Sequence, residues 1–96
     1  LGAFYQQKRD FFLDAIRDSR FKFIPSKGTY FQLLDFSEIS QESDIVFTEM
    51  LTKKHGLATI PISVFNKDKL DKKQLRVCFA KTEETLQAAA NILNSL

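Results

Sequence analysis

The first residues of the chain alternate between apolar and polar side chains with the period of a helix. Apolar side chains at positions 4, 5, 11, 12, 15 and 16 fall on one broad helical face, and the polar side chains fall largely elsewhere. This spacing predicts an amphipathic helix over residues 3–19 that packs on a core.

Two strands are predicted next. Residues 21–24, FKFI, form a short apolar run that ends at Pro25 and the turn sequence Ser26-Lys27-Gly28. Residues 29–36, TYFQLLDF, are almost continuously apolar, which predicts a strand buried on both faces. We expect the two strands to pair as a hairpin or to lie as neighbours.

The middle of the chain has clear signals for a second helix. Ser43, with Asp44 behind it, is a suitable N-cap, and Gly56 suits the left-handed position after a helix end. Residues 57–65 are apolar and β-branched, but Pro61 lacks a backbone donor, so we expect a short strand followed by an extended loop. Residues 66–73 are rich in charge, and we expect a surface turn there.

The segment KQLRVCFAK predicts another strand. Apolar side chains at positions 75, 77 and 79 share one face, which places Arg76 on the opposite face with Cys78 and Ala80. Thr82 then caps a last helix, whose apolar positions 86, 89, 90, 93 and 96 form one stripe. The predicted order is α-β-β-α-β-β-α, an α+β fold with helices packed against a small mixed or antiparallel sheet.

The composition fits one soluble globular domain. The chain has 96 residues, of which 44% are hydrophobic and 27% charged, and its net charge is only +2. This charge does not suggest a nucleic acid or a membrane as a partner, and no apolar run reaches the ~18 residues of a membrane span. A single cysteine allows no internal disulfide and favours a reducing compartment, so we expect a cytoplasmic protein.

Arg76 is the sharpest candidate for a functional residue. A guanidinium on a strand offers a rigid fork that matches a carboxylate or phosphate through two parallel hydrogen bonds. Its small neighbours Cys78 and Ala80 leave room for a ligand. From the pattern alone, however, a surface arginine or a structural ion pair is the better interpretation.

Three other residues have simpler explanations. His55 precedes the glycine that ends a helix, where an imidazolium would be stabilised by the negative end of the helix dipole. With one histidine and one cysteine, the sequence indicates no cluster of metal ligands. Cys78 lies in an apolar strand, which predicts a packed, inert thiol. Ser63 has neither a nucleophile-elbow pattern nor a base nearby in sequence, and is interpreted as loop structure.

The sequence SKGTYF invites comparison with RNA-binding strands. Stacking aromatic residues must alternate to share a sheet face, whereas Tyr30 and Phe31 are adjacent. No glycine-rich phosphate loop and no paired acid and base can be identified, so the residues by themselves do not indicate an enzyme.

Four segments in this order resemble a known family: YQQKRDFF, KGTYFQLLDFS, HGLATIPISVF and LRVCFAKTEETLQAAANIL. Together they resemble the C-terminal small domain of fold-type I, pyridoxal-phosphate-dependent aminotransferases of class I/II. The match is closest to the kynurenine and methionine (glutamine-type) aminotransferase-like group, and it covers essentially the whole chain.

The resemblance implies that Arg76 grips the α-carboxylate of amino-acid and 2-oxo-acid substrates. It also implies that Gly28, Tyr30 and Phe31 lie near the rim of the cleft, where one of the two rings, which we take to be Phe31, lines the side-chain pocket. The alternative for both rings is simple packing in the core. Pro61, Ser63 and Phe65 would lie in a loop near the substrate.

The resemblance further implies that this chain is a fragment of a homodimeric parent. Residues 1–19 would lead out of an absent large domain, and residues 20–96 would form the small domain. The large domain would hold pyridoxal 5'-phosphate and the lysine that binds it, so the fragment would contain no catalytic and no cofactor-binding residue. The alternative is a free-standing α+β module that binds a protein or RNA partner.

Overall fold

The computed structural model of the chain describes residues 2–63 and 72–96. The predictions for residues 64–71 therefore lie outside the described residues. The described elements, in order, are α1 (Ala3–Ala15), β1 (Phe31–Asp35), α2 (Asp44–His55), β2 (Ile60–Pro61), β3 (Gln74–Cys78) and α3 (Glu83–Asn94). This arrangement confirms the predicted α+β class.

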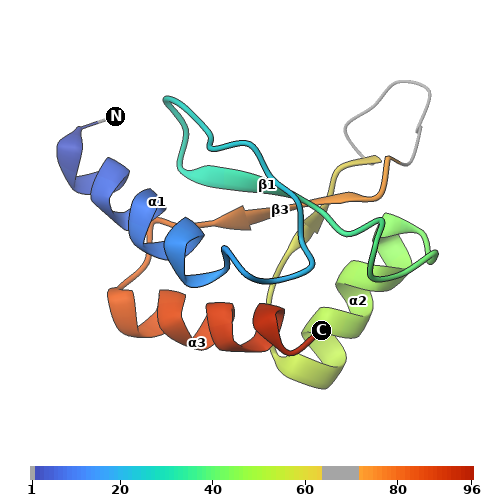
Figure 1. Cartoon of the computed structure of the whole chain (residues 1–96). Helices are drawn as coiled ribbons and strands as arrows, with labels where there is room; N and C mark the ends of the chain where they lie inside the picture. The colour runs from blue at the N-terminus through green and yellow to red at the C-terminus, as the bar shows by residue number, and fades with distance from the viewer. Residues whose placement is uncertain (1, 64–71) are drawn as a thin grey trace.

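The three strands form one antiparallel sheet in the order β1-β3-β2. Figure 1 shows α3 beneath the sheet, with α1 and α2 towards its two ends and no described helix above β1 and β3. The helices α1 and α3 pack on each other, and α2 packs on β2 and β3. Helices therefore cover one face of the sheet, and no helix among the described residues covers the other, which is called the uncovered face below.

The core lies between the covered face and the helices. Leu75 and Val77 of β3 are buried, as their alternation predicts, and they belong to the same core cluster as the buried stripe of α3. The rings of Phe36 and Phe47 stack with centroids 4.2 Å apart and planes tilted by 10°. The other fully or almost fully buried apolar side chains are Phe12, Leu13, Ile16, Phe21, Leu34, Leu51, Phe79, Leu86, Ala89, Ala90 and Leu93.

Local signals for the helix ends are confirmed. The Ser43 hydroxyl accepts a hydrogen bond from the Val46 amide at 3.2 Å, and the Thr82 hydroxyl accepts one from the Thr85 amide at 3.2 Å. Gly56 ends α2 with a φ of 67°, a left-handed conformation that glycine adopts without strain. Both ends of α2 and the start of α3 therefore lie where short-range chemistry indicates.

Three predictions about the first third of the chain are wrong in detail. The first helix ends at Ala15 rather than at residue 19. Residues 21–24 form no strand, and only a single antiparallel bridge joins Lys22 to Asp35. β1 is buried on one face only, with Leu34 inside and Leu33 exposed, because the described helices cover a single face of the sheet.

No described helix is long and apolar enough to cross a membrane.

Candidate functional site

The uncovered face of the sheet carries a cation between apolar neighbours. Arg76 lies on the central strand β3, where Leu33 of β1 is its partner on one side and Ile60 of β2 is its partner on the other. The side chains of Leu33 and Ile60 are 38% and 40% exposed. The prediction that Arg76 faces away from the core is confirmed.

Phe31 holds the guanidinium of Arg76 from one side. The Cζ atom of Arg76 lies over the Phe31 ring, 4.4 Å from its centroid. Such a cation-π contact contributes about 0.5–2 kcal/mol, depending on how far water is excluded. The contact uses the face of the guanidinium, whereas the N–H donors lie in its plane. Stacking on Phe31 is therefore compatible with hydrogen bonding to a planar anion.

A hollow of about 360 Å³ opens beside this pair. Its walls come from the end of β3, the segment before β2, the residues at the start of β1 and the first turns of α3. Its lining residues are Tyr30, Phe31, Leu57, Ala58, Thr59, Ile60, Arg76, Val77, Cys78, Lys81, Thr85, Leu86 and Ala89. A mostly apolar hollow with a few polar groups is typical of a small-molecule site.

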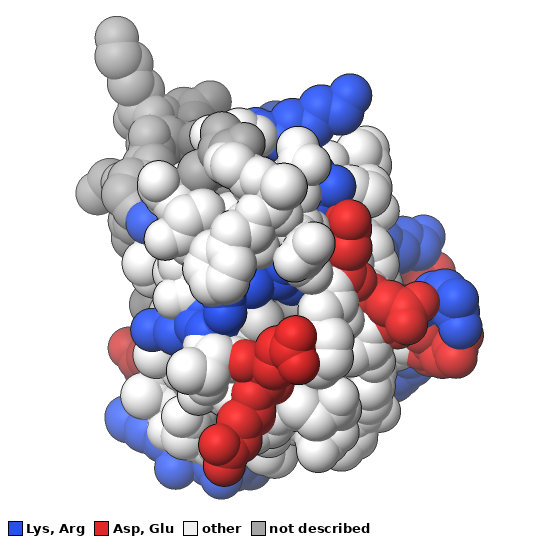
Figure 2. All heavy atoms as spheres, turned by 90° about the vertical axis from the view of Figure 1, so that its left-hand side faces the viewer, with Lys and Arg blue, Asp and Glu red and all other residues white. Residues whose placement is uncertain are grey.

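The hollow has Arg76 and Lys81 as its positively charged lining residues. Figure 2 shows the side of the molecule that is on the left of Figure 1, where blue side chains cross the middle and red side chains lie below and to the right of them. The first turn of α3 contributes the acids Glu83 and Glu84. This face is mixed in charge, unlike the continuous basic surface typical of proteins that bind nucleic acids.

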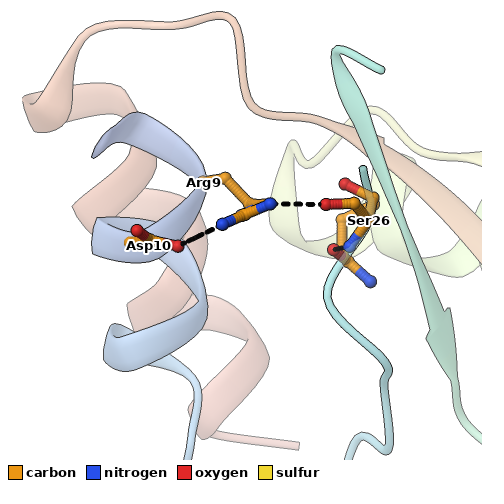
Figure 3. A network of polar contacts seen from close by, with 4 residues as sticks. Arg9, Asp10 and Ser26 are labelled. Carbon is orange, nitrogen blue, oxygen red and sulfur yellow. Dashed lines mark hydrogen bonds and ion pairs between the residues drawn. The ribbon is translucent and has the colours of Figure 1, made fainter. Parts of the chain in front are cut away.

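The loop before β1 is held by two polar side chains. Figure 3 shows Arg9 of α1 between Asp10 and Ser26; it donates to the Ser26 carbonyl oxygen at 2.6 Å and pairs with the Asp10 carboxylate at 2.9 Å. Gln32 is almost fully buried, accepts a hydrogen bond from the Ser26 amide at 2.9 Å and donates to the Ile24 carbonyl oxygen at 2.8 Å. The amide and carbonyl groups of Ser26 are thus both fixed by side chains from outside the loop.

Tyr30 and Phe31 follow this loop and line the same hollow as Arg76. Tyr30 is half exposed, and its ring meets the Tyr5 ring edge to face at 4.9 Å. The structure therefore brings the three candidate substrate-binding residues together, and their roles remain predictions. Gly28 lies earlier in the loop, with a φ of 71°.

A second polar link was missed by sequence reasoning. Asp44 is 1% exposed, and its carboxylate accepts hydrogen bonds from the Ser63 amide at 2.7 Å and the Ser63 hydroxyl at 2.8 Å. The sequence marked Asp44 only as the residue behind an N-cap and Ser63 only as loop structure. These residues are 19 positions apart, so short-range patterns could not pair them.

The remaining candidates are distributed differently. Cys78 is exposed, so the prediction of a packed thiol is wrong; it lies on the face of β3 that no described helix covers. His55 is the last residue of α2, where a positive charge would interact favourably with the negative end of the helix dipole. Among residues 2–63 and 72–96, no three His, Cys, Asp or Glu side chains lie close enough together to hold a metal ion.

Comparison with known proteins identifies the family. The family model "Aminotransferase class I and II" matches residues 3–93. The chain belongs to this family. The match confirms the resemblance of the four sequence segments, and it does not favour a free-standing binding module.

Sequence relatives of this aminotransferase-family chain are much longer than the chain itself. It is 48% identical over 96 residues to the methionine aminotransferase of Escherichia coli (strain K12), covering 100% of this chain and 25% of that protein. It is 32% identical over 115 residues to the kynurenine-oxoglutarate transaminase of Dictyostelium discoideum, covering 100% of this chain and 26% of that protein. The chain thus spans about a quarter of the length of the relatives it matches.

Solved structures agree with the fold of this family member. An Escherichia coli protein with methionine aminotransferase function superposes with a TM-score of 0.91 at 48% identity, covering 97% of this chain and 24% of that one. The N-succinyldiaminopimelate aminotransferase of Mycobacterium tuberculosis superposes with a TM-score of 0.83 at 28% identity, covering 95% of this chain and 24% of that one.

Proposed function

We propose that this chain is the small-domain part of a pyridoxal-phosphate-dependent aminotransferase and that Arg76 binds the α-carboxylate of its substrates. The parent would move an amino group between an amino acid and a 2-oxo acid. The observation that carries the proposal is the position of Arg76, stacked on Phe31 in the middle of the uncovered sheet face. Residues 1–19 would lead from the large domain, and residues 20–96 would form the small domain.

A fixed arginine suits both halves of a transamination. The amino acid and the 2-oxo acid share the α-carboxylate, so one bidentate contact serves both. Phe31 beneath the guanidinium and Ile60, which lines the same hollow from the neighbouring strand, supply apolar surface, which would reduce the water around a bound anion and strengthen the charge pair. Holding the carboxylate also orients the Cα–H bond for proton removal, which is a positioning role.

The described residues fit the substrate better than the cofactor. When bound, pyridoxal phosphate supplies the electron sink for the amino-group transfer. A lysine that bonds to it is normally desolvated, and no described lysine is buried. The first turn of α3, near the hollow, carries Glu83 and Glu84, which disfavour a phosphate there. The burial of the lysines is known only for the described residues, so it is the family resemblance that leads us to place the cofactor lysine outside this chain and to expect the isolated chain to be inactive.

Three further properties are proposed, two from the family resemblance and the cytoplasmic location also from the single cysteine. The parent is proposed to form a homodimer, to act in the cytoplasm, and to use amino acids of the kind named for its relatives, methionine or kynurenine. The share of the relatives that the chain covers supports the view that it is part of a longer enzyme.

The test uses the full-length enzyme that carries this chain, with Arg76→Ala and a matched control, Arg17→Ala. Arg17 is exposed and pairs with Asp14 on α1, away from the hollow. Arg76→Ala is expected to lower kcat/KM for the amino acid by a factor equivalent to about 2–5 kcal/mol. The cofactor's absorbance should stay unchanged, and Arg17→Ala should behave as the wild type.

A substrate without the carboxylate sharpens this test. The amine that corresponds to the amino acid cannot use the clamp, so its slow turnover should be the same with Arg76 and with Ala at this position. If the Arg76→Ala enzyme lost its cofactor while its affinity for the substrate acid stayed intact, the assignment would be wrong.

A further inference from the structure

Asp44 is a buried carboxylate that the proposed substrate contact does not use. It begins α2, where the partial positive charge of the helix N-terminus favours an anion. Its two oxygens accept hydrogen bonds from the Ser63 amide at 2.7 Å and from the Ser63 hydroxyl at 2.8 Å. Ser63 itself is only 6% exposed. Because an unpaired carboxylate is costly to bury, Asp44 must keep such partners. The link therefore ties the start of α2 firmly to Ser63.

The segment that ends at Ser63 needs this attachment. Its strand β2 has only two residues, Ile60 and Pro61, and it lies at the edge of the sheet. Pro61 has no backbone N–H to donate to β3. The sheet by itself thus holds this segment weakly, and Asp44 provides a second anchor at its far end.

The anchored segment forms one wall of the hollow. Residues 57–60 line it, and Ile60 is the direct sheet partner of Arg76. A shift of this segment would move Ile60 away from the guanidinium and admit water beside a bound carboxylate. The charge pair would weaken, because water raises the local dielectric constant.

We propose that Asp44 is a positioning residue: through Ser63 it fixes residues 57–63 so that Ile60 shields the carboxylate bound at Arg76. The inference rests on the proposed function. Asp44 does not touch the substrate, so its effect is expected on substrate affinity rather than on the chemical step.

The first experiment compares Asp44→Asn with Asp35→Asn in the full-length enzyme. Asparagine has the shape of aspartate but only one acceptor oxygen, so one of the two hydrogen bonds from Ser63 is lost. Asp35 is a matched control, because its carboxylate also accepts a hydrogen bond from a backbone amide, that of Ser37 at 2.8 Å, but Asp35 does not line the hollow. We expect Asp44→Asn to raise KM for the amino acid about tenfold, as a change of 1.4 kcal/mol does, with kcat almost unchanged. Asp35→Asn should change neither constant.

The second experiment measures hydrogen exchange in residues 57–63 and requires no activity. In Asp44→Asn these amides, and that of Ser63 above all, should exchange faster than in the wild type, with no such change in Asp35→Asn. Ser63→Ala removes only the hydroxyl contact, so it should raise KM in the same direction by a smaller factor, and it serves if Asp44→Asn does not fold.

The outcomes separate this inference from the proposed function. If the wild-type enzyme transaminates but Asp44→Asn and Ser63→Ala lower stability and kcat without raising KM, Asp44 is merely structural and the inference is overturned. Unchanged exchange at Ser63 in Asp44→Asn overturns it as well. If the wild-type enzyme shows no transamination with any amino acid, the proposed function fails instead, and the exchange data still decide whether Asp44 anchors the segment.

Discussion

The guanidinium carbon of Arg76 lies 4.4 Å from the centre of the Phe31 ring, across the two neighbouring strands β3 and β1. The direct sheet partner of Phe31 is Cys78, two positions beyond Arg76, so the ring reaches its cation along a diagonal. The small side chain of Cys78 leaves space for this approach. The cation and its aromatic support thus form one unit, and a change in either should affect the other.

Replacing Phe31 with leucine removes the π-system but keeps an apolar side chain. In the full-length enzyme, Phe31→Leu is expected to raise KM for the amino acid about fivefold, the equivalent of about 1 kcal/mol of lost cation-π contact. The matched control is Phe4→Leu, because the Lys8 ammonium lies 4.8 Å from the Phe4 ring in a similar contact without Arg76. Steady-state kinetics would contradict this expectation if both variants raised KM equally.

Gln32 is expected to contribute to stability far more than an exposed glutamine does. Its side chain is almost fully buried and hydrogen bonds to the Ser26 amide and the Ile24 carbonyl oxygen. Gln32→Leu leaves these backbone groups without that partner, which should cost about 1–3 kcal/mol of unfolding free energy. Gln87→Leu is the control, since Gln87 is exposed and donates a hydrogen bond to the side chain of Asn91 rather than to a backbone group. Urea denaturation of the full-length protein measures the unfolding free energy of both variants. An equal decrease in the two would show that the hydrogen bonds of Gln32 do not contribute to stability.

The features that the sequence predicted correctly depend on short-range chemistry. Ser43 and Thr82 cap helices because their hydroxyls reach amides three residues ahead. The outward direction of Arg76 follows from the alternation of its own strand, so it needs no knowledge of the rest of the fold. The direction of the candidate cation was therefore available from nine residues of sequence.

The features that the sequence missed depend on which surfaces meet. Leu33 is exposed although the near-continuous apolar pattern predicts burial on both faces of its strand, and its polar neighbour Gln32 is the one that is buried. Only the helices beneath the sheet and the loop at Ser26 determine the correct face. The link from Asp44 to Ser63 joins distant segments in the same way, and a sequence without relatives beside it contains no signal for such a pairing.

Gly56 should be sensitive to substitution because of its backbone alone. Its φ of 67° is left-handed, yet an added Cβ would meet nothing within 4 Å. Gly56→Ala should therefore cost about 1–2 kcal/mol of conformational strain without a clash. Gly2→Ala is the control, because Gly2 has a φ of −76° and equally open surroundings. Thermal unfolding of the full-length protein should show a lower Tm for Gly56→Ala and an unchanged Tm for Gly2→Ala. Equal Tm values for the two variants would argue against strain at this helix end.

Cys78 provides a chemical probe of the candidate site. Its thiol is exposed on the uncovered face of β3, two residues from Arg76, and lines the same hollow. In the full-length enzyme, iodoacetamide should label Cys78 under native conditions, as peptide mass spectrometry can measure. A saturating 2-oxo acid should slow this labelling, because a carboxylate held by Arg76 would occupy the space beside the sulfur. In Arg76→Ala the protection should disappear while the labelling rate without ligand stays similar. Protection that persisted in Arg76→Ala would place the acid elsewhere, since the thiol would then be shielded by a ligand that does not depend on this guanidinium.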